Sequence, residues 1–343
     1  MPRTTISPEQ TMNNQRFRCY LVTQQGDKQL HGQVVERMLD DLPLGDVLVR
    51  VEYSGLNYKD ALSASGHPGV TRRWPHVPGI DAAGSIVESQ APKLLPGRKV
   101  LVTGYDLGQN TWGGYAEYIR VPGDWVLPLP DGLSARDAMI YGTAGLTAAL
   151  CLDALEKHNI APDAGEVVVT GASGGVGSLA VAMLARLGYK VAAVSGKPQA
   201  HQFLRELGAS SILGREEVYE AGPKPLLAER WAGAVDTVGG TTLATLVRSA
   251  RYRSCVTACG LVGGDALSLS VYPFILRGVT LVGIDSVECP RALRERLWSK
   301  LAESWRPAQL EAIAREEIGL DELSDALERI KRGETIGRVL VKL

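Results

Sequence analysis

Residues 166–193, EVVVTGASGGVGSLAVAMLARLGYKVAA, decide the fold of this chain because they contain a strand, a glycine turn, a helix and a second strand in succession. Residues 166–170 are a short β-branched run, which is typical of a strand in a parallel sheet buried on both faces. Residues 178–187 are rich in Ala and Leu, Gly188 stands where a helix C-terminal cap is expected, and residues 190–194 return to β-type side chains. The stretch therefore predicts a βαβ unit.

The turn between the predicted strand and helix has the spacing Ala172-x-Gly174-x-x-Gly177, which departs by one methyl group from the dinucleotide-binding fingerprint G-x-G-x-x-G. Gly174 allows the backbone to approach a pyrophosphate, Gly177 allows the helix to pack close to the strand, and the N–H groups of the first helical turn face the anion. A plain tight turn is the alternative, but the flanking strands and helix favour a cofactor site. The predicted phosphate-binding residues are Ser173, Gly174, Gly175, Val176 and Gly177.

Length and composition set the class of the protein. The chain has 343 residues, 45% of them hydrophobic, and a formal charge of −1, so it can form two globular domains of ordinary size. Without a basic excess we expect no nucleic-acid partner. No uninterrupted apolar stretch is long enough to span a membrane, and the polar first residues lack the hydrophobic region of a signal peptide, so we expect a cytoplasmic protein without a membrane partner. Residues 1–15 are predicted to be a disordered extension.

The five cysteines are scattered along the chain and odd in number, which fits a reducing compartment better than a disulfide framework. Cys255 and Cys259 are four residues apart, but no second cysteine pair or histidine spacing accompanies them. We interpret them as buried free thiols rather than as zinc ligands.

The order of the predicted elements indicates two architectures. The first third of the chain contains short alternating strands separated by Gly, Pro and Asp, as in an all-β module. After two helices predicted within residues 134–150, strands and helices alternate up to a sixth strand at 279–284, which favours a doubly wound parallel sheet. Helices at 291–302 and 320–332 and a last strand at 338–342 follow, and this strand needs the sheet of the β-rich domain as its host.

Four motifs carry a resemblance to a known family, namely GLNYKDAL (55–62), HVPGIDAAG (76–84), NTWGGYAE (110–117) and YGTAGLTA (141–148). Together with the glycine turn they resemble the medium-chain dehydrogenase/reductase superfamily, and within it the zinc-free quinone-oxidoreductase-like branch that contains the acrylyl-CoA reductases. The resemblance covers nearly the whole chain from Arg16 onward.

The resemblance implies an α/β fold in which a Rossmann domain interrupts a β-rich GroES-like catalytic domain. The GroES-like domain is expected over residues 16–138 and 287–343, and the NADPH-binding Rossmann domain over residues 139–286. The zinc alcohol dehydrogenases of this superfamily carry a Cys where this chain has Asn57, and Gly-His-Glu where it has residues 78–81. We therefore expect no metal, and no alcohol oxidation of the zinc type.

Zinc-free members of this branch reduce a carbon–carbon double bond conjugated to a carbonyl group, with hydride going to the β-carbon and a proton to the α-carbon. This reaction needs orientation and a hydrogen bond to the developing enolate more than a metal. The resemblance implies an NADPH-dependent oxidoreductase for an acyl-CoA or another small activated alkene, with reduction of acrylyl-CoA to propionyl-CoA as the first choice. A quinone, enone or enal reductase and an NADPH-binding structural or sensory protein are the alternatives, since a Rossmann domain indicates binding rather than turnover.

The end of the second strand of the βαβ unit indicates which nicotinamide cofactor binds. An NAD-preferring site carries Asp or Glu there to bond the ribose 2′-OH. This chain has Val194-Ser195-Gly196-Lys197-Pro198 and no carboxylate. Ser195 can donate to a 2′-phosphate and Lys197 can neutralise it, which favours NADPH. A plain solvated turn would leave the missing acid unexplained.

The resemblance also implies further cofactor contacts. Thr143 is expected near the nicotinamide, although a helix N-cap explains it almost as well. Gly260 is expected near the nicotinamide ribose, and Ile284 and Ser286 near the carboxamide. Arg338 is expected to reach a phosphate of the cofactor or substrate, with an ordinary surface arginine as the alternative.

Four polar residues are the catalytic candidates. Asn57, Tyr58 and Asp60 lie in the loop where the zinc enzymes keep a ligand, and Asn57 or Tyr58 could hydrogen-bond the thioester oxygen. Asp81 is a candidate acid or base, with a structural role as the favoured interpretation.

Three other residues concern the choice of substrate. Arg72 and Arg73 could hold the phosphates of CoA, because guanidinium groups bind phosphate in a bidentate manner, with an ordinary exposed loop as the alternative. Tyr105 stands where close relatives commonly carry Trp, which changes the expected shape of the acyl pocket.

The predicted sixth strand, residues 279–284, is β-branched and apolar at what should be an edge of the sheet. An uncovered edge of this kind pairs readily with another chain. We therefore expect a homodimer in which two such strands join.

Overall fold

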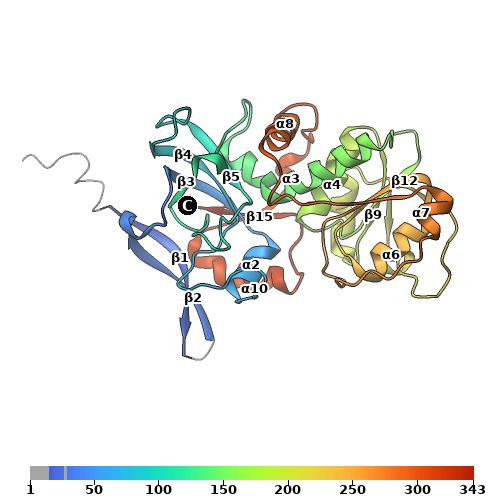
Figure 1. The fold of residues 1–343 in the computed structure, drawn as a ribbon, viewed down its shortest axis with the longest axis horizontal. Helices are drawn as coiled ribbons and strands as arrows, with labels where there is room; N and C mark the ends of the chain where they lie inside the picture. Colours follow the sequence, from blue (N-terminus) through green and yellow to red (C-terminus); the bar gives the residue numbers. More distant parts are fainter. Residues whose placement is uncertain (1–14, 27–28) are drawn as a thin grey trace, which may run out of the picture. The chain divides into compact units, whose positions relative to one another are not determined.

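The computed structural model describes residues 15–26 and 29–343. The predicted disordered extension, residues 1–15, lies outside the described residues except for Gln15. The chain divides into two compact units (Figure 1). Unit 1 runs up to Thr143 and resumes over Glu316–Leu343, and unit 2 comprises Ala144–Arg315.

Unit 1 is built on a sheet in which six strands follow in the order β14-β15-β3-β4-β5-β7, and β6 pairs with β3. Because β15 pairs antiparallel with β3, the prediction that the last strand joins the sheet of the β-rich domain is confirmed. The strands are β3 (Val47–Gly55), β4 (Asp81–Ser89), β5 (Lys99–Thr103), β6 (Tyr118–Val121), β7 (Leu127–Pro128), β14 (Ala314–Ile318) and β15 (Arg338–Lys342).

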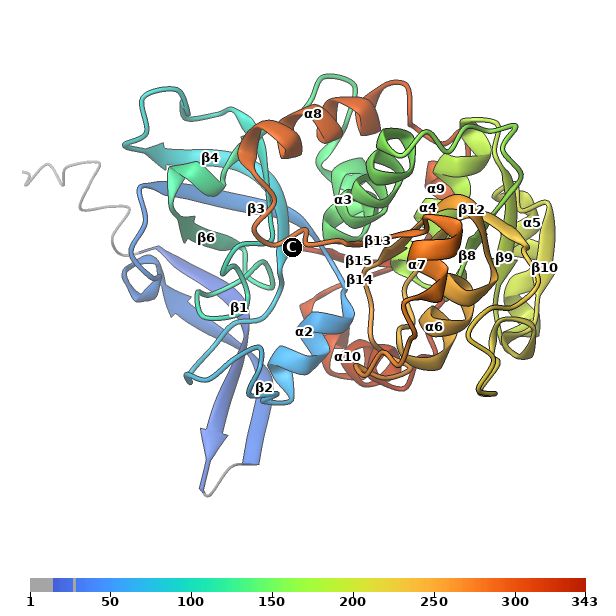
Figure 2. The same ribbon diagram turned by 45° about the vertical axis from the view of Figure 1, so that its right-hand side comes forward.

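A hairpin and two helices complete unit 1. The hairpin consists of β1 (Arg16–Gln25) and β2 (Gln29–Met38), which pair antiparallel. Helix α2 (Tyr58–Ala64) lies beside helix α10 (Leu323–Lys331) from the far end of the chain (Figure 2). Apolar side chains of β1, α2 and α10 share one buried core, so the two separate stretches of sequence fold as one body.

Helix α2 corrects one expectation, because Asn57 and Asp60 do not belong to a loop. Asn57 is the N-cap of α2 and Asp60 is the third residue of the helix. The backbone N–H of Asn57 donates to Oδ2 of Asp60 at 2.8 Å, which is half of a capping box. The pattern N-x-x-D carries this signal, but the helix is too short for its apolar periodicity to be recognised.

Unit 2 contains a six-stranded parallel sheet in the order β10-β9-β8-β11-β12-β13. The order reverses between β8 and β11, which confirms the predicted doubly wound Rossmann sheet and places the expected ligand crevice outside the carboxyl ends of the strands. The valines of β8 are fully buried, as a central strand covered on both faces requires. The strands are β8 (Glu166–Val169), β9 (Lys190–Val194), β10 (Ser211–Leu213), β11 (Trp231–Asp236), β12 (Ala250–Ala258) and β13 (Thr280–Gly283).

Helices α4 and α6 lie on opposite sides of these strands (Figure 1). The remaining helices connect or flank the strands. The helices are α3 (Ala135–Lys157), α4 (Gly175–Arg186), α5 (His201–Glu206), α6 (Gly240–Ser249), α7 (Tyr272–Arg277), α8 (Arg291–Ala302) and α9 (Leu310–Ile313). Short 3-10 helices are η1 (Leu39–Asp41), η2 (Gly123–Trp125), η3 (Pro198–Ala200), η4 (Arg215–Val218) and η5 (Leu320–Glu322).

Helix α3 spans the two helices predicted within residues 134–150, which meet at a non-helical residue, Gly142. It is continuous except for a kink at Gly142, where φ is 51° and ψ is −152°. Within the described part of the chain α3 is the one helix long and apolar enough to cross a membrane, but 94% of its most apolar window is buried inside the protein. This burial is that of a core helix.

Residues 287–315 lie in unit 2, whereas the resemblance places them in the GroES-like domain. Helix α8 accounts for the difference, because it is tied to α3 within unit 2. Arg296 pairs with Asp153 at 2.8 Å, and Lys300 pairs with Glu156 at 3.0 Å. The chain therefore returns to unit 1 only within β14.

Candidate cofactor and substrate site

The glycine turn of unit 2 connects β8 to α4 as predicted, and the predicted phosphate-binding residues 173–177 run from this turn into the first turn of α4. Gly174 is the N-cap of α4, and its N–H donates to the carbonyl oxygen of Gly171 at 2.9 Å. A Cβ on Gly177 would lie 2.7 Å from the Cα of Ala172, so the helix approaches the turn only because this residue is glycine. A Cβ on Gly174 would meet one carbonyl oxygen, at 3.4 Å, and is otherwise in open space. This geometry fits the pyrophosphate of a dinucleotide.

The carboxyl end of β9 lies next to the glycine turn. Ser195 is buried, and its hydroxyl donates to Oγ of Ser173 at 3.2 Å. The backbone N–H of Lys197 donates to Oγ of Ser195, also at 3.2 Å. The structure thus joins two predicted cofactor segments into one site.

Arg215 is a candidate cofactor-site residue that sequence reasoning missed. It begins η4, directly after β10, and its guanidinium lies against Gly196, where any Cβ would collide with Nε. The Ser195 hydroxyl, the Arg215 guanidinium beside Gly196 and the neighbouring Lys197 thus lie along one short stretch at the end of β9, and groups of this kind suit a 2′-phosphate. The sequence could have indicated Arg215 by its position just after β10, because the neighbouring parallel strand β9 ends at the same edge of the sheet.

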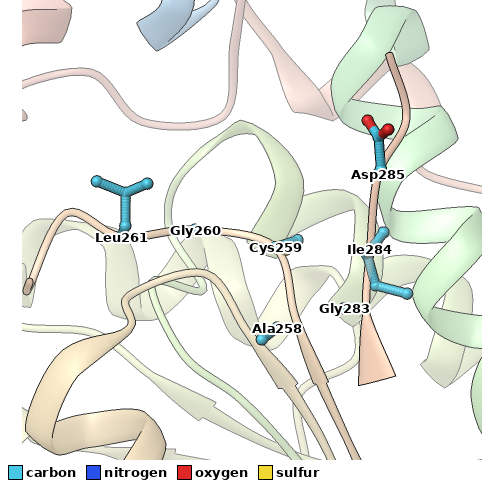
Figure 3. Close-up of a pocket in the computed structure, with 7 residues that line it drawn as sticks. All are labelled: Ala258, Cys259, Gly260, Leu261, Gly283, Ile284 and Asp285. Atoms are coloured by element: carbon cyan, nitrogen blue, oxygen red, sulfur yellow. The ribbon is translucent and has the colours of Figure 1, made fainter. Parts of the chain in front are cut away.

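A pocket of about 550 Å³ opens at the carboxyl ends of β12 and β13. Figure 3 shows that the segments leaving these two paired strands lie side by side. Gly260 and Ile284, both predicted to contact the nicotinamide half of the cofactor, are brought together there, while Ser286 lies outside the lining. The lining residues are Ala258, Cys259, Gly260, Leu261, Gly283, Ile284 and Asp285.

Asp236 fixes the turn that follows β11. In the sheet, β11 lies between β8, which leads into the glycine turn, and β12, which ends at this pocket. Its Oδ1 accepts a hydrogen bond from Thr170 at 2.6 Å and its Oδ2 accepts one from the N–H of Gly239 at 2.7 Å. Burial raises the pKa of Asp236, and these hydrogen bonds oppose the rise. A hydrogen bond with Cys151, together with burial, raises the pKa of Cys259 well above its usual range, which favours the neutral thiol.

In unit 1, four predicted site residues form one buried hydrogen-bond network around Asp81. Oδ1 of Asp81 accepts bonds from the N–H and the hydroxyl of Thr143, at 2.9 and 2.6 Å. Its Oδ2 accepts a bond from Nδ2 of Asn57 at 2.8 Å. Arg338 donates to Oδ1 of Asn57 at 3.0 Å and lies 3.7 Å from Oδ2 of Asp81.

Arg338 is 2% exposed, so the interpretation as a surface arginine is wrong. Its guanidinium also donates to the backbone carbonyls of Ile140 and Leu56, at 3.1 and 2.8 Å. These contacts turn it toward the interior of unit 1 and do not support the expected contact with a phosphate. Burial raises the pKa of Asp81 and lowers that of Arg338, while the attraction between the two charges opposes both shifts.

Asp60 lies beneath this network and is completely buried. Its oxygens accept hydrogen bonds from the N–H of Ile80 at 2.9 Å, the N–H of Asn57 at 2.8 Å and the hydroxyl of Tyr115 at 2.8 Å. These bonds use both carboxylate oxygens inside the protein. The geometry therefore supports a role in holding α2 and β4 rather than contact with a substrate.

The donor set around Asp81 does not fit the metal of the zinc enzymes. Asn57 offers an amide in place of a thiolate, and the guanidinium of Arg338 is already bonded to Asn57 and paired with Asp81. Zinc requires Cys, His or carboxylate ligands around one point, and a permanent cation among them opposes its binding. The buried arginine thus supplies the positive charge of this site.

The other substrate-side candidates are exposed or partly exposed. Tyr58, the first residue of α2, is 40% exposed. Arg72 and Arg73 are exposed, and Nε of Arg72 donates to the carbonyl oxygen of Pro68 at 2.8 Å. The ring of Tyr105 stacks on that of Trp125, with the ring centres 5.5 Å apart.

Comparisons with known proteins cover most of the chain. The model of the alcohol dehydrogenase GroES-like domain matches residues 43–131, and that of the zinc-binding dehydrogenase matches residues 175–303. The acrylyl-CoA reductase AcuI of Ruegeria pomeroyi is 48% identical over 308 residues, which cover 90% of this chain and 93% of that protein. The chain belongs to the quinone-oxidoreductase-like branch of the medium-chain dehydrogenase/reductase superfamily.

Other members of this branch agree with the fold. YhfP of Bacillus subtilis, which bears a quinone oxidoreductase name, is 47% identical over 89% of this chain and 92% of its own. Its crystal structure with NAD bound has a TM-score of 0.93 at 44% identity and covers 96% of this chain and all of that one. The yhdH oxidoreductase of Salmonella enterica in complex with NADP has a TM-score of 0.91 at 48% identity and the same coverage. The predicted superfamily and fold class are confirmed.

Proposed function

We propose that this chain is an NADPH-dependent reductase of the carbon–carbon double bond of a short 2-enoyl-CoA, with acrylyl-CoA as substrate and propionyl-CoA as product. The observation that carries the proposal is the match to AcuI over nine-tenths of the chain. The network around Asp81 supports it, because a hydrogen-bonded arginine replaces a Lewis acid and the reaction needs none.

The groups at the end of β9 support NADPH as the cofactor. The yhdH oxidoreductase was crystallised with NADP and yhfP with NAD, so the branch includes complexes with both. Ser195, Lys197 and Arg215 are the proposed partners of the 2′-phosphate: Arg215 lies against Gly196, which stands between the other two in the sequence, and charge-assisted hydrogen bonds from Lys197 and Arg215 would favour a phosphate over a hydroxyl. When bound, NADPH supplies the hydride that goes to the β-carbon of the enoyl group.

Tyr58 is the proposed hydrogen-bond donor to the thioester oxygen. Negative charge develops on that oxygen as the enolate forms, and a phenol can stabilise it and pass a proton to the α-carbon. Tyr58 is partly exposed at the first turn of α2, and Asn57 and Asp60 fix that turn. Asn57, Asp60 and Asp81 are therefore proposed as positioning residues for Tyr58 and Thr143.

Arg72 and Arg73 are proposed to hold the phosphates of CoA. Both are exposed and adjacent in the chain, and only Nε of Arg72 is used in a hydrogen bond within the described residues. The terminal nitrogens can then bind phosphate oxygens in pairs.

We also propose that the chain forms a homodimer in the cytoplasm. β13 is an edge strand of the described sheet, with β12 on one side. Just before it in the sequence, helix α7 and its N-cap carry exposed apolar side chains at helical spacing, here called the α7 face: Val271, Tyr272, Ile275 and Leu276. Apolar patches of this kind are typical of protein interfaces. All five cysteines are free thiols, in agreement with a reducing compartment.

Rates of NADPH oxidation test the activity. Acrylyl-CoA, crotonyl-CoA and a naphthoquinone are compared at one concentration, and acrylyl-CoA is expected to react fastest. Arg215→Ala should raise the KM for NADPH by about 10- to 100-fold and leave that for NADH unchanged, because one charge-assisted hydrogen bond is lost. The proposal fails if acrylyl-CoA is reduced no faster than the quinone.

A quinone or enone reductase is the second candidate, and the match to YhfP favours it. It predicts that the naphthoquinone is the better substrate and that Arg72→Ala leaves all rates unchanged. The CoA-dependent activity instead predicts a higher KM for acrylyl-CoA in that variant, with turnover preserved.

A further inference from the structure

The segment 284–287, which leaves β13, forms one wall of the pocket but has no regular structure of its own. It supplies Ile284 and Asp285 to the lining (Figure 3). The N–H of Ile284 donates to the carbonyl oxygen of Ala258 at 3.0 Å, and the residues beyond it leave the sheet. A wall of irregular backbone needs other anchors to keep its shape, because each of its buried polar groups requires a partner.

Two side chains outside the pocket provide these anchors. Nη2 of Arg294 donates to the carbonyl oxygens of Ser286 and Val287, both at 3.0 Å. The hydroxyl of Thr147 in α3 donates to Oγ of Ser286 at 2.9 Å. Together they fix the two residues that immediately follow the lining residues Ile284 and Asp285.

The burial of Arg294 indicates that the hydrogen bonds of its guanidinium group have a structural role. The side chain is 1% exposed on α8, next to the buried side chains Leu297 and Trp298, where an apolar residue would avoid the cost of dehydrating a guanidinium. The same helix carries Arg296, which is partly exposed and pairs with Asp153 of α3. In the part of the chain that the structure describes, Arg296 forms no hydrogen bond or ion pair with the segment 284–287. The two arginines thus differ in their partners. Arg294 binds the pocket wall, whereas Arg296 binds helix α3.

We propose that Arg294 is a positioning residue for the nicotinamide half of the cofactor site, acting through the backbone of Ser286 and Val287. The inference rests on the proposed function, in which this pocket receives the nicotinamide. Arg294 fixes the position of Ile284 and Asp285 relative to Cys259 and Gly260, which also line the pocket. It thereby fixes the distance from the nicotinamide ring to the β-carbon of the enoyl group. The adenosine half, at the ends of β8 and β9, does not depend on this anchor.

Arg294→Met and Arg294→Lys test the inference, with Arg296→Met as the matched control on the same helix. Three quantities are measured: the affinity for 2′,5′-ADP, which fills only the adenosine half; turnover of acrylyl-CoA; and the primary deuterium isotope effect with NADPH labelled at the transferred hydrogen. Both Arg294 variants should bind 2′,5′-ADP as the wild type does. Their turnover should fall by about 10- to 100-fold and the isotope effect should rise, because a misplaced ring slows hydride transfer itself. Arg296→Met should resemble the wild type in all three.

Two results would overturn the inference: turnover and isotope effect equal to those of the wild type, or a loss of turnover accompanied by an equal loss of 2′,5′-ADP affinity, which indicates general loosening of unit 2. Arg294→Lys keeps the buried charge without the guanidinium, so it decides the matter if Arg294→Met does not fold. A wild-type protein that binds neither 2′,5′-ADP nor NADPH contradicts the proposed function instead, and the two failures are distinguishable.

Discussion

Asp60 accepts three hydrogen bonds and is buried beside a second buried carboxylate, Asp81. Burial, together with the charge of Asp81, raises the pKa of Asp60 to about 6 despite these donors. In the unfolded chain the pKa of an aspartate is about 4, so the folded state binds this proton more tightly. The corresponding stability is fully present below about pH 4 and is lost as the pH rises through about 6.

Tyr115→Phe tests this linkage, because it removes a hydrogen bond that favours the charged carboxylate of Asp60. The pKa of Asp60 should rise further, and the free energy of unfolding relative to wild type should fall by about 1–2 kcal/mol more at about pH 8 than at about pH 5. Urea unfolding over this range measures the difference.

Tyr20→Phe is the control for the pH experiment. It removes a bond of 2.9 Å from another buried tyrosine in unit 1, but to the hydroxyl of Ser324 rather than to a carboxylate. Its loss of stability should vary less with pH. Parallel pH curves for Tyr115→Phe and the wild type would show that Asp60 does not titrate as described.

The sequence identified which residues belong to the site more readily than it identified the residues with which they form hydrogen bonds. Asn57 and Arg338 were predicted as ligand contacts, with a surface position as the alternative for Arg338, and Asp81 was favoured as a structural residue, whereas the structure bonds Asn57 to both of the others. Arg338 is hundreds of positions from the other two, and only the pairing of β15 with β3 brings them together. Arg215 was missed for the same reason, since its nearness to Gly196 depends on the pairing of β9 with β10.

Helix α3 depends on one glycine at its kink. At φ 51° and ψ −152°, Gly142 occupies a region that is essentially restricted to glycine, and a Cβ there would collide with the carboxylate of Asp81. The kink therefore allows the helix to bring the N–H of Thr143 to Asp81.

Gly142→Ala should lower the free energy of unfolding by about 2–4 kcal/mol, the sum of backbone strain and displacement of the Asp81 network. Thermal unfolding measures the loss. Gly132→Ala is the matched control, because Gly132 also has a positive φ, 83°, but a Cβ there would have no neighbour within 4 Å. Equal losses in both variants would mean that the contact with Asp81 contributes nothing.

Elements whose pattern is local were predictable, and elements fixed by remote contacts were not. The unit formed by β8, α4 and β9 follows from valine runs, an alanine-rich helix and glycines at the turns. Helix α2 has seven residues and is stabilised by its cap and by packing on α10, so its sequence alone does not distinguish it from a loop. The sequence predicted two helices within residues 134–150, and they meet at the kink of α3 at Gly142.

At the scale of the whole molecule, the family resemblance predicted the order of the domains. It did not predict where the chain returns from the Rossmann domain to the GroES-like domain. Residues 287–315 are polar and helical, and nothing in their pattern assigns them to either sheet. In the folded chain, the partly exposed ion pairs of Arg296 and Lys300 join α8 to the part of α3 that lies in unit 2, although such pairs contribute little stability. The α7 face, by contrast, could be identified only from the structure, which shows that each of its apolar side chains is exposed.

The proposed homodimer makes the last prediction. Ile275 and Leu276 in the α7 face are 68% and 57% exposed, and β13 beside them in the sequence is half-buried with one paired edge. If two copies join there, Ile275→Glu/Leu276→Glu places four carboxylates in one apolar interface and should yield the monomer in light scattering at micromolar protein, because unpaired charges are costly to bury. Leu44→Glu is the control, since Leu44 is 96% exposed in unit 1 and its replacement should leave the mass at twice that of the chain. A wild-type protein with the mass of one chain, or a double variant that remains dimeric, would contradict an interface at the α7 face.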